Sequence, residues 1–372
     1  MNEVTRHPHP ADARLLFVLS GDYGELSSAL HLLHDQPLAK NALMLAPPHI
    51  ASANAGALPC RLHPYRTPRD VVSALEEWQP DIAMLFSGYL YGMSTMFEAS
   101  VTTAGVAELL QEVIRRAPRV VTSDPFHGLL FDPEMASRLC ERAESLRVAR
   151  DLLSGVAHFY PVRCDGLAAG AKDRAVWAFN PALVRSTPAA DPFWLFVLSS
   201  TDYLLRVAEL GEAPFVDRVC QRLLDAAAAG RHPVFIAPES CGAGVRARLG
   251  ERDDVTILSS CPHGRFTELL LDAEYVFYWN MLSHSTVLRY GNSRPVFFFD
   301  QGHMCVFRPA YDTAVENYFL GWRPVFLDDR QPLRPSLLRI VDRFSSAERG
   351  AIGEHLRSGP TPVEMVAALL AS

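Results

Sequence analysis

Residues 272–304 read DAEYVFYWNMLSHSTVLRYGNSRPVFFFDQGHM, and this stretch decides the fold. It contains two short apolar runs of β-forming residues, 275–279 and 295–299. Neither run alternates apolar with polar residues, which is typical of strands buried on both faces of a parallel sheet. A polar turn, 280–286, and a short helical segment ending near Gly291 separate the runs. The pattern therefore predicts a strand–helix–strand unit in a parallel sheet.

The turn between these strands carries several polar side chains where the helix begins. The N-terminus of a helix offers unpaired backbone N–H groups and the positive end of the helix dipole, which suit a phosphate. Ser283, Ser285 and Thr286 add hydroxyl donors, and Asn280 adds an amide. One serine or threonine is enough to cap a helix. The residues leave two readings open, a helix cap alone and an anion-binding site.

Length and composition bound the class of protein. The chain has 372 residues, of which 49% are hydrophobic and 21% charged, so we expect two globular domains. The net charge of −7 and the absence of a basic run argue against nucleic acid as a partner. Seven scattered cysteines without a CxxC pair favour free thiols in a reducing compartment. No signal-peptide pattern and no apolar run of about 18 residues appear, so we expect a cytoplasmic protein without a membrane span.

Both halves of the chain open in the same way. Residues 14–20 and 193–199 read as buried strands, and the polar turns after them contain Asp22 and Ser200-Thr201. A strand, a polar turn and a helix open a nucleotide-type α/β domain. We therefore predict an α/β protein with two Rossmann-like domains, residues 1–185 and 186–372. Further strands are expected at 41–46, 59–65, 80–86, 119–123, 233–237, 255–258 and 323–327, and helices at 25–33, 68–78, 106–116, 133–153, 214–229, 266–271, 335–343 and 361–371.

Candidate acid–base residues follow the strands of the first half. Asp22 lies in the first turn, and Asp124 and His127 follow the strand at 119–123. Ligands of α/β sheets bind at the carboxyl ends of the strands. An Asp in a Gly-containing turn such as 21–24 also has a purely structural role, and Asp124 with a surface His127 also suits a helix cap, so structural roles stay open for all three.

Two Rossmann-like halves with a phosphate-binding turn late in the second resemble the GT-B glycosyltransferases. The resemblance implies an acceptor-binding N-terminal domain and a C-terminal domain for the nucleotide sugar, facing each other across a cleft. It also implies that the last helix, 361–371, returns to the first domain. The nucleotide sugar would be a co-substrate, with no further cofactor and no metal, and no metal-binding DxD motif is present.

The likeness is closest over 266–304. Plant-type glycosyltransferases carry a box in which Trp-Asn and a hydroxyl residue open a helix on the diphosphate, and a later acidic residue and Gln hold the sugar. Trp279-Asn280, the hydroxyl residues of 283–286 and Asp300-Gln301 resemble this box. The resemblance implies diphosphate contacts from Asn280, Ser285 and Thr286 and sugar contacts from Asp300 and Gln301. From their positions after strands or at the helix start, we add Ser200, Thr201, Ser283 and His284 as candidates for the donor. His303, just past a strand end, is a candidate for the sugar or acceptor, with an exposed loop His as the alternative.

The sequence also departs from that box. The Glu expected soon after the helix start is missing, because residues 288–290 read Leu-Arg-Tyr. In the family this Glu often holds the ribose hydroxyls. Glu239, which follows the second strand of this half, is a candidate substitute, and a surface Glu is the alternative.

An inverting sugar transfer needs a general base near the acceptor hydroxyl. Some protein-arginine rhamnosyltransferases resemble this chain in having an Asp in the first strand-to-helix loop, which implies that Asp22 is the base. Asp124 and His127 are its rivals. Tyr, Phe and Met in the loops 87–94 and 123–128 favour a small-molecule acceptor.

The function predicted is transfer of a sugar from a nucleotide sugar to a small-molecule acceptor. Two alternatives stay open, a sugar-nucleotide 2-epimerase and a non-catalytic binding or assembly protein with the same fold. The sequence also leaves open whether the chain forms a homodimer.

Overall fold

The computed structural model describes residues 9–21, 23–92, 97, 101–141, 143–185, 192–259 and 261–372. The chain divides into two compact units. Unit 1 contains the residues up to Leu183 together with Arg357–Ser372, and unit 2 is Val184–Leu356. The last helix, α16 (Pro362–Ala371), belongs to unit 1, as the resemblance implied for residues 361–371.

Within the described residues, unit 1 is built on a parallel sheet of seven strands in the order β3-β2-β1-β4-β5-β6-β7. Its strands are β1 (Leu15–Val18), β2 (Ala42–Ala46), β3 (Arg61–Pro64), β4 (Ile82–Leu85), β5 (Arg119–Ser123), β6 (Ala157–Tyr160) and β7 (Ala175–Trp177). The α-helices that join or follow them are α1 (Tyr23–Leu33), α2 (Pro48–Ala53), α3 (Pro68–Trp78), α4 (Thr103–Arg116), α5 (Pro133–Cys140), α6 (Glu144–Leu153) and α7 (Ala169–Lys172).

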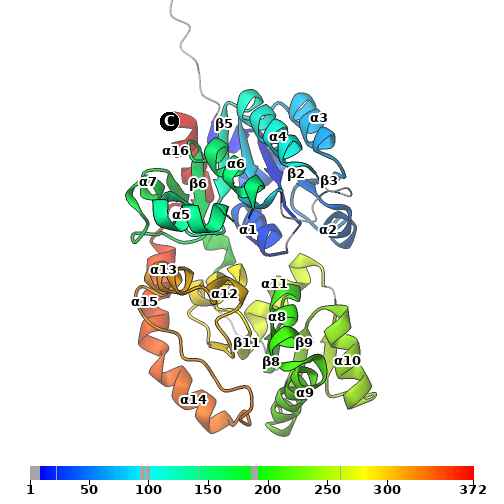
Figure 1. The fold of residues 1–372 in the computed structure, drawn as a ribbon. Coiled ribbons are helices and arrows are strands. Elements are labelled where there is room, and N and C mark those ends of the chain that lie inside the picture. Colours follow the sequence, from blue (N-terminus) through cyan, green and yellow to red (C-terminus); the bar gives the residue numbers. More distant parts are fainter. Residues whose placement is uncertain are drawn as a thin grey trace, which may run out of the picture. The chain divides into compact units, whose positions relative to one another are not determined.

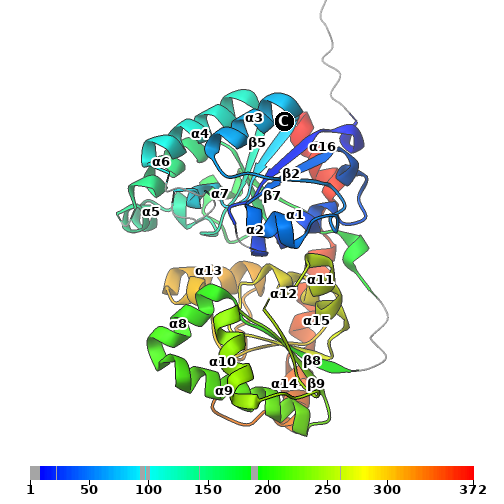
Figure 2. The ribbon, with the colours of Figure 1, turned by 90° about the vertical axis from the view of Figure 1, so that its right-hand side faces the viewer.

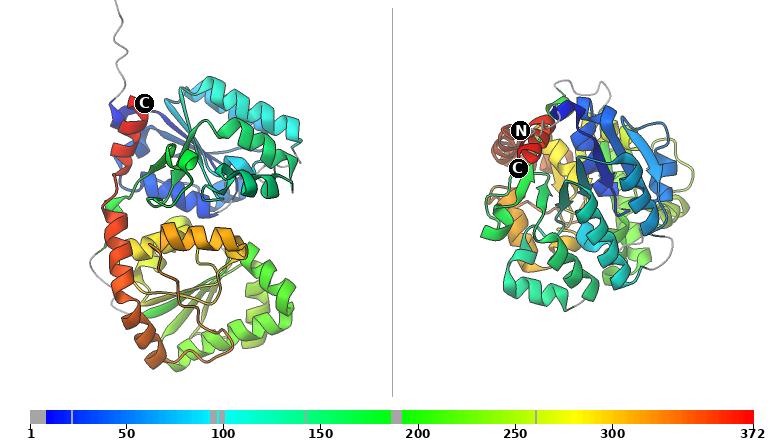
Figure 3. Two further views of the ribbon diagram at one scale, coloured as in Figure 1. Left: turned by 60° about the vertical axis from the view of Figure 1, so that its left-hand side comes forward. Right: turned by 90° about the horizontal axis from the view of Figure 1, so that it is seen from above.

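Helices cover both faces of this sheet, because its strands are apolar on both faces. On one face, Phe17 of β1 packs with Leu30 of α1 and with Val366 of α16. On the other face, Leu16 packs with residues of α3, α4 and α6. Figure 2 shows α3 and α4 on one side of the sheet and α1 on the other. In Figure 3, α16 (red) lies beside the blue start of the described chain, where it contacts the short helix η1 (Pro10–Asp12).

Unit 2 repeats the plan with the strand order β10-β9-β8-β11-β12, all parallel within the described residues (Figure 1). The strands are β8 (Phe193–Val197), β9 (His232–Ile236), β10 (Thr256–Leu258), β11 (Tyr275–Tyr278) and β12 (Val296–Phe298). The helices are α8 (Ser200–Leu210), α9 (Glu212–Ala228), α10 (Glu239–Leu249), α11 (His263–Asp272), α12 (His284–Gly291), α13 (Arg308–Tyr318), α14 (Pro335–Phe344) and α15 (Ser346–Arg357).

One face of this second sheet is covered by α9, α10 and α14. Phe196 and Phe277 stack with ring centroids 4.6 Å apart and pack with Val219 of α9, Val245 of α10 and Leu338 of α14. Right-handed crossovers place α11 and α12 on the opposite face. Both sheets have the Rossmann strand order, so the prediction of an α/β protein with two Rossmann-like halves is confirmed.

Some elements differ from the expectation. The strand expected at 323–327 is reduced to one bridge between Phe326 and Phe298, because Pro324 has no N–H to donate to a ladder. The single helix expected at 133–153 is two helices, since Ala143 is extended. The sequence patterns missed α2, α7, α8, α10, α13 and α15.

Candidate functional site

Three turns of unit 2 meet at the carboxyl edge of its sheet. They follow β8, β11 and β12, which are neighbours, and they contain residues 198–199, 279–283 and 299–302. The order of the strands reverses between β8 and β11. Ligands of parallel α/β sheets bind at such switch points. Most of the predicted ligand-binding residues lie in these turns or at the start of the helix that follows each turn.

The first turn of α12 carries hydroxyl groups that bond to one another. The Oγ atoms of Ser283 and Ser285 are 2.6 Å apart, and the Tyr278 hydroxyl donates to Ser285 Oγ at 2.7 Å. The Thr286 hydroxyl donates to the carbonyl of Ser283 at 2.7 Å. Ser283 holds the N-cap position, yet its side chain makes no capping hydrogen bond. The serine hydroxyls are therefore held at the positive end of the helix without serving as an ordinary cap.

The polar side chains at the start of α12 differ in how far they are exposed to solvent. Ser285 and Thr286 are 3% and 2% exposed, and His284 is buried as well, whereas Ser283 is partly exposed. Burial raises the pKa of Tyr278, which keeps its phenol protonated as a donor to Ser285. A ligand at this helix terminus would therefore meet Ser283 first.

The turns after β11 and β12 touch at Asn280 and Gly302. Asn280 accepts a hydrogen bond from Leu282 N at 2.8 Å, and Met281 N donates to the carbonyl of Gln301 at 3.3 Å. Gly302 has a φ of +83°, and a Cβ there would lie 2.5 Å from Asn280 Cγ and Oδ1. Only glycine fits both the left-handed backbone and the close approach.

Asp202 joins the first turn of α8 to the loop after β12. It is 1% exposed, and one carboxylate oxygen accepts from His303 N at 2.9 Å and from His303 Nδ1 at 2.8 Å. The other oxygen accepts from Ser199 Oγ at 2.5 Å. Burial raises the pKa of Asp202, but the hydrogen bonds from His303 and Ser199 outweigh it and leave the pKa below its ordinary value. The ionised carboxylate thus fixes the orientation of the partly exposed His303 ring.

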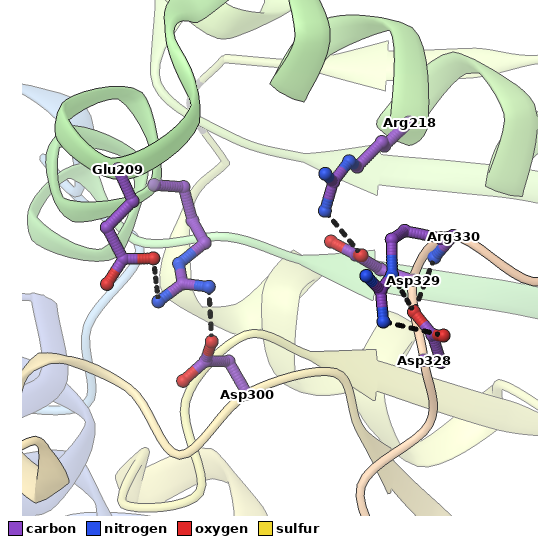
Figure 4. Close-up of polar contacts among 7 residues, drawn as sticks. Glu209, Arg218, Asp300, Asp328, Asp329 and Arg330 are labelled. Carbon is purple, nitrogen blue, oxygen red and sulfur yellow. Dashed lines mark hydrogen bonds and ion pairs between the residues drawn. The ribbon is translucent and has the colours of Figure 1, made fainter.

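Asp300 is engaged by Arg206 of α8. Its carboxylate lies 2.5 Å from Arg206 NH1, and the same guanidinium also reaches Glu209 at 2.8 Å. Figure 4 shows Glu209 and Asp300 on either side of that guanidinium. Gln301 follows, and within the residues that the structure describes its side-chain amide has no hydrogen bond. The predicted sugar-binding pair is thus one fixed carboxylate and one unengaged amide.

The remaining predicted residues of unit 2 lie at neighbouring helix starts. Ser200 and Thr201 are exposed in the first turn of α8. Glu239 is exposed at the start of α10, where it accepts from the Ser259 hydroxyl and from Arg246 at 2.5 Å. These hydrogen bonds, that of Ser259 first, lower the pKa of Glu239. Glu239 follows β9, so it stands beside the β8 turn on the side away from β11.

In unit 1, Asp124 is buried and holds its own loop. Its carboxylate accepts from Phe126 N at 2.8 Å, from Gly128 N at 2.7 Å and from the Tyr160 hydroxyl at 2.7 Å. His127 sits between these amides with a φ of +51°, and burial lowers the pKa of its imidazole. Three donors engage Asp124, so the geometry suits a residue that shapes the loop.

The first turn of unit 1 contains Asp22, which lies outside the described residues, as do residues 93 and 94 of the expected acceptor loop. Around it, Ser20 donates to Glu25 of α1 through both its amide, at 2.8 Å, and its hydroxyl, at 2.5 Å. This turn follows β1, next to β4, where the strand order of unit 1 reverses. It therefore lies at the switch point of its own sheet.

Among the described residues there is no group of three or more His, Cys, Asp or Glu side chains that could hold a metal ion. No helix in the same part of the chain is long and apolar enough to cross a membrane.

Searches against known protein families and against curated proteins find no match to the sequence. Among solved structures, the spinosyn forosaminyltransferase SpnP is 15% identical, with a TM-score of 0.57 over 97% of this chain and 100% of that one. The spinosyn rhamnosyltransferase SpnG, complexed with thymidine diphosphate, is 16% identical, with a TM-score of 0.55 over 96% of this chain and 99% of that one. This chain has the GT-B fold.

The same GT-B architecture also includes epimerases. A putative UDP-N-acetylglucosamine 2-epimerase from Listeria monocytogenes is 10% identical, with a TM-score of 0.50 over 96% of this chain and 95% of that one. At these identities the likeness establishes the fold, and the chemistry must be argued from the residues.

The sequence patterns missed Asp202 and Arg206 in this candidate site. The spacing Ser199-x-x-Asp202 is typical of a helix N-cap and could have indicated the start of α8. Asp202 N does donate to Ser199 Oγ at 3.1 Å. The contacts of Asp202 with His303 and of Arg206 with Asp300 join residues about a hundred positions apart, and no local pattern reports them.

Proposed function

We propose that this protein is a glycosyltransferase that moves a sugar from a nucleotide-sugar donor to a small-molecule acceptor, without a metal and with inversion. One observation carries the proposal. In a chain with the GT-B fold, the hydroxyl-bearing start of α12 lies at the switch point of the second sheet, and Ser283 there leaves the helix uncapped by its side chain. That combination suits a diphosphate.

The donor would bind unit 2. Backbone amides at the start of α12, with Asn280, Ser283, His284, Ser285 and Thr286, would hold the diphosphate, and Ser200 and Thr201 would reach it from α8. Asp300 and Gln301 would bind the sugar hydroxyls. Glu239 would take the ribose, in place of the Glu that the family box has.

His303 would act on the leaving group or on the sugar. Because Asp202 accepts from Nδ1, the Nε2 atom remains for a ligand. Through Nε2 the ring would accept from a sugar hydroxyl, or donate to a diphosphate oxygen when that nitrogen carries a proton.

In the reaction, a base takes the proton of the acceptor hydroxyl while the acceptor oxygen bonds to the anomeric carbon. The bond between that carbon and the diphosphate breaks, and the negative charge that develops on the diphosphate is stabilised at the helix terminus. We propose Asp22 as the base. To take the proton, Asp124 would have to give up donors that hold its loop, so we assign it and His127 to shaping the acceptor side.

The test is release of nucleoside diphosphate from a panel of nucleotide sugars in the presence of acceptors and of EDTA. We expect acceptor-dependent release that EDTA does not reduce. Asp22→Asn should lower kcat by about a hundredfold or more, while Asp12→Asn, at an exposed position of the same unit, should leave it unchanged. Activity that Asp22→Asn leaves intact would contradict the assignment of the base.

An epimerase is the second candidate, because a putative epimerase shares the fold. It would interconvert the nucleotide sugar without any acceptor. Product analysis of the same panel without acceptor separates the two functions.

A further inference from the structure

Large apolar side chains are exposed around α14 of unit 2. Leu337, Ile340 and Phe344 are 41%, 65% and 71% exposed, and their spacing places them on one face of the helix. Trp322 and Val325, in the connection before α14, are 49% and 40% exposed. These five residues form what we call the α14 patch. Clustered apolar exposure of this kind marks an interaction surface.

The two parts of the α14 patch belong to one surface. Trp322, Val325 and Phe344 line the same shallow hollow, whose lining also includes the buried Phe298 of β12 and Phe319. Apolar side chains from the helix and from the connection therefore surround one depression.

Hydrogen bonds and an ion pair to the rest of unit 2 hold the backbone that carries the α14 patch. Leu327 N donates to the Phe298 carbonyl at 2.7 Å, and Leu333 N donates to an Asp225 carboxylate oxygen at 2.8 Å. Asp329 pairs with Arg218 of α9 at 2.9 Å (Figure 4). Leu338 on the opposite face of α14 is fully buried. The segment that carries the exposed apolar side chains is thus held in place within unit 2.

Exposed arginines lie on the same stretch of chain as the α14 patch, at one flank of α14 and in the connection before it. Arg323, Arg334, Arg339 and Arg343 are exposed, and within the described part of the chain none of them has an ion pair. Glu348 is an acidic side chain that lines the hollow. A surface with a local excess of positive charge thus stands on a chain whose net charge is −7.

We propose that the α14 patch docks unit 2 on an anionic lipid surface. The apolar side chains would enter the boundary between headgroups and acyl chains, and the arginines would meet lipid phosphates. Pairing two copies of the chain through this surface would bring the same four arginines toward each other, which is unfavourable. The proposal does not depend on the sugar-transfer function.

The test is sedimentation of the full chain with vesicles of phosphatidylcholine, or of phosphatidylcholine mixed with phosphatidylglycerol, at low and high salt. We expect binding to the anionic vesicles that high salt weakens. Each of Arg339→Gln and Arg343→Gln should lower the binding constant about fivefold, and Phe344→Ser about tenfold or more. Leu204→Ser and Arg69→Gln, which change exposed residues elsewhere, should bind like the wild type.

Circular dichroism and melting temperature check that each variant is folded. Absence of binding by the folded wild-type chain, or equal binding by Phe344→Ser, would overturn the proposal. So would a concentration-dependent dimer that Phe344→Ser abolishes, without vesicle binding, because the surface would then be an interface between two copies.

Discussion

The His303 ring donates through Nδ1 to the buried carboxylate of Asp202 at 2.8 Å, and so joins the loop after β12 to the first turn of α8. The two residues closely follow two of the three turns that meet at the carboxyl edge of the second sheet. This contact fixes the shape of the proposed donor site before any donor binds.

Asp202→Asn should lower the free energy of unfolding by about 1.5–3 kcal/mol at neutral pH, because a charge-assisted acceptor for His303 and Ser199 is lost. The pKa of Asp202 is below its ordinary value of 3.8, so the carboxylate stabilises the fold above that pH. This contribution fades as the pH falls through the lower folded pKa. Urea denaturation at several pH values should therefore show the difference between variant and wild type shrinking in acid.

The control for Asp202 is Asp254→Asn, which removes an exposed ion pair with Arg252. The loss of unfolding free energy should be clearly smaller than for Asp202→Asn, because exposed ion pairs contribute little to stability. Equal losses from the two substitutions would contradict the role given to the Asp202–His303 contact.

Gly302→Ala should destabilise unit 2 more than Gly230→Ala does. Both glycines have positive φ, +83° and +71°, so both variants carry the cost of a left-handed alanine, about 1 kcal/mol. A Cβ at Gly302 would also meet Asn280 at 2.5 Å, whereas nothing lies within 4 Å of one at Gly230. Thermal denaturation of the two variants isolates the clash, and equal melting temperatures would show that the turns after β11 and β12 do not touch.

Arg289→Met should cost about 3 kcal/mol or more of unfolding free energy. The buried guanidinium donates to the carbonyls of Leu270, Ala273, Glu274 and Pro295 at 2.7–3.1 Å and so ties α11 to both strands of the deciding stretch. Burial lowers the pKa of Arg289 to about 9, and the side chain remains charged at neutral pH. Denaturation of Arg289→Lys should show partial recovery, while Arg265→Met, at an exposed position of α11, should change little.

The strands could be predicted from sequence because their chemistry is local. Short apolar runs of β-forming residues such as 193–199 and 275–279 are typical of strands buried on both faces, and both became inner strands of the sheet of unit 2. Helices without a clear apolar stripe were missed, as in α10, where Gly242 and Gly244 weaken the helical signal.

The polar contacts could not be predicted in the same way. No local pattern indicated that Arg289 would extend to the carbonyls at the other end of its strands. Asp300 was expected to be open to a sugar, and a salt bridge from α8 engages it. The contacts of Arg289 and of Asp300 both depend on which elements the fold brings together, and no local sequence pattern reports that.

His31 should make unit 1 less stable as the pH falls below 6.5. Asn180 N donates to its Nε2 at 3.1 Å, which requires a neutral ring, and burial lowers the pKa of His31 to about 4. Protonation therefore favours the unfolded chain between these two pH values, by about 3 kcal/mol at most. His31→Gln should flatten the loss seen by urea denaturation, and the exposed His63→Gln should not. An unchanged pH profile for His31→Gln would contradict this account.

The measurement that tests the central claim most directly is calorimetric titration of the protein with thymidine, uridine and guanosine diphosphates. Ser283→Asp places a negative charge at the start of α12, where it would cap the helix and repel a diphosphate, and Ser346→Asp places the same charge at the exposed start of α15. We predict that at least one diphosphate binds the wild type and Ser346→Asp equally, and that Ser283→Asp loses this binding while keeping its melting temperature. Equal binding by all three proteins, or binding of no diphosphate by the wild type, would contradict the claim that the start of α12 is a diphosphate site.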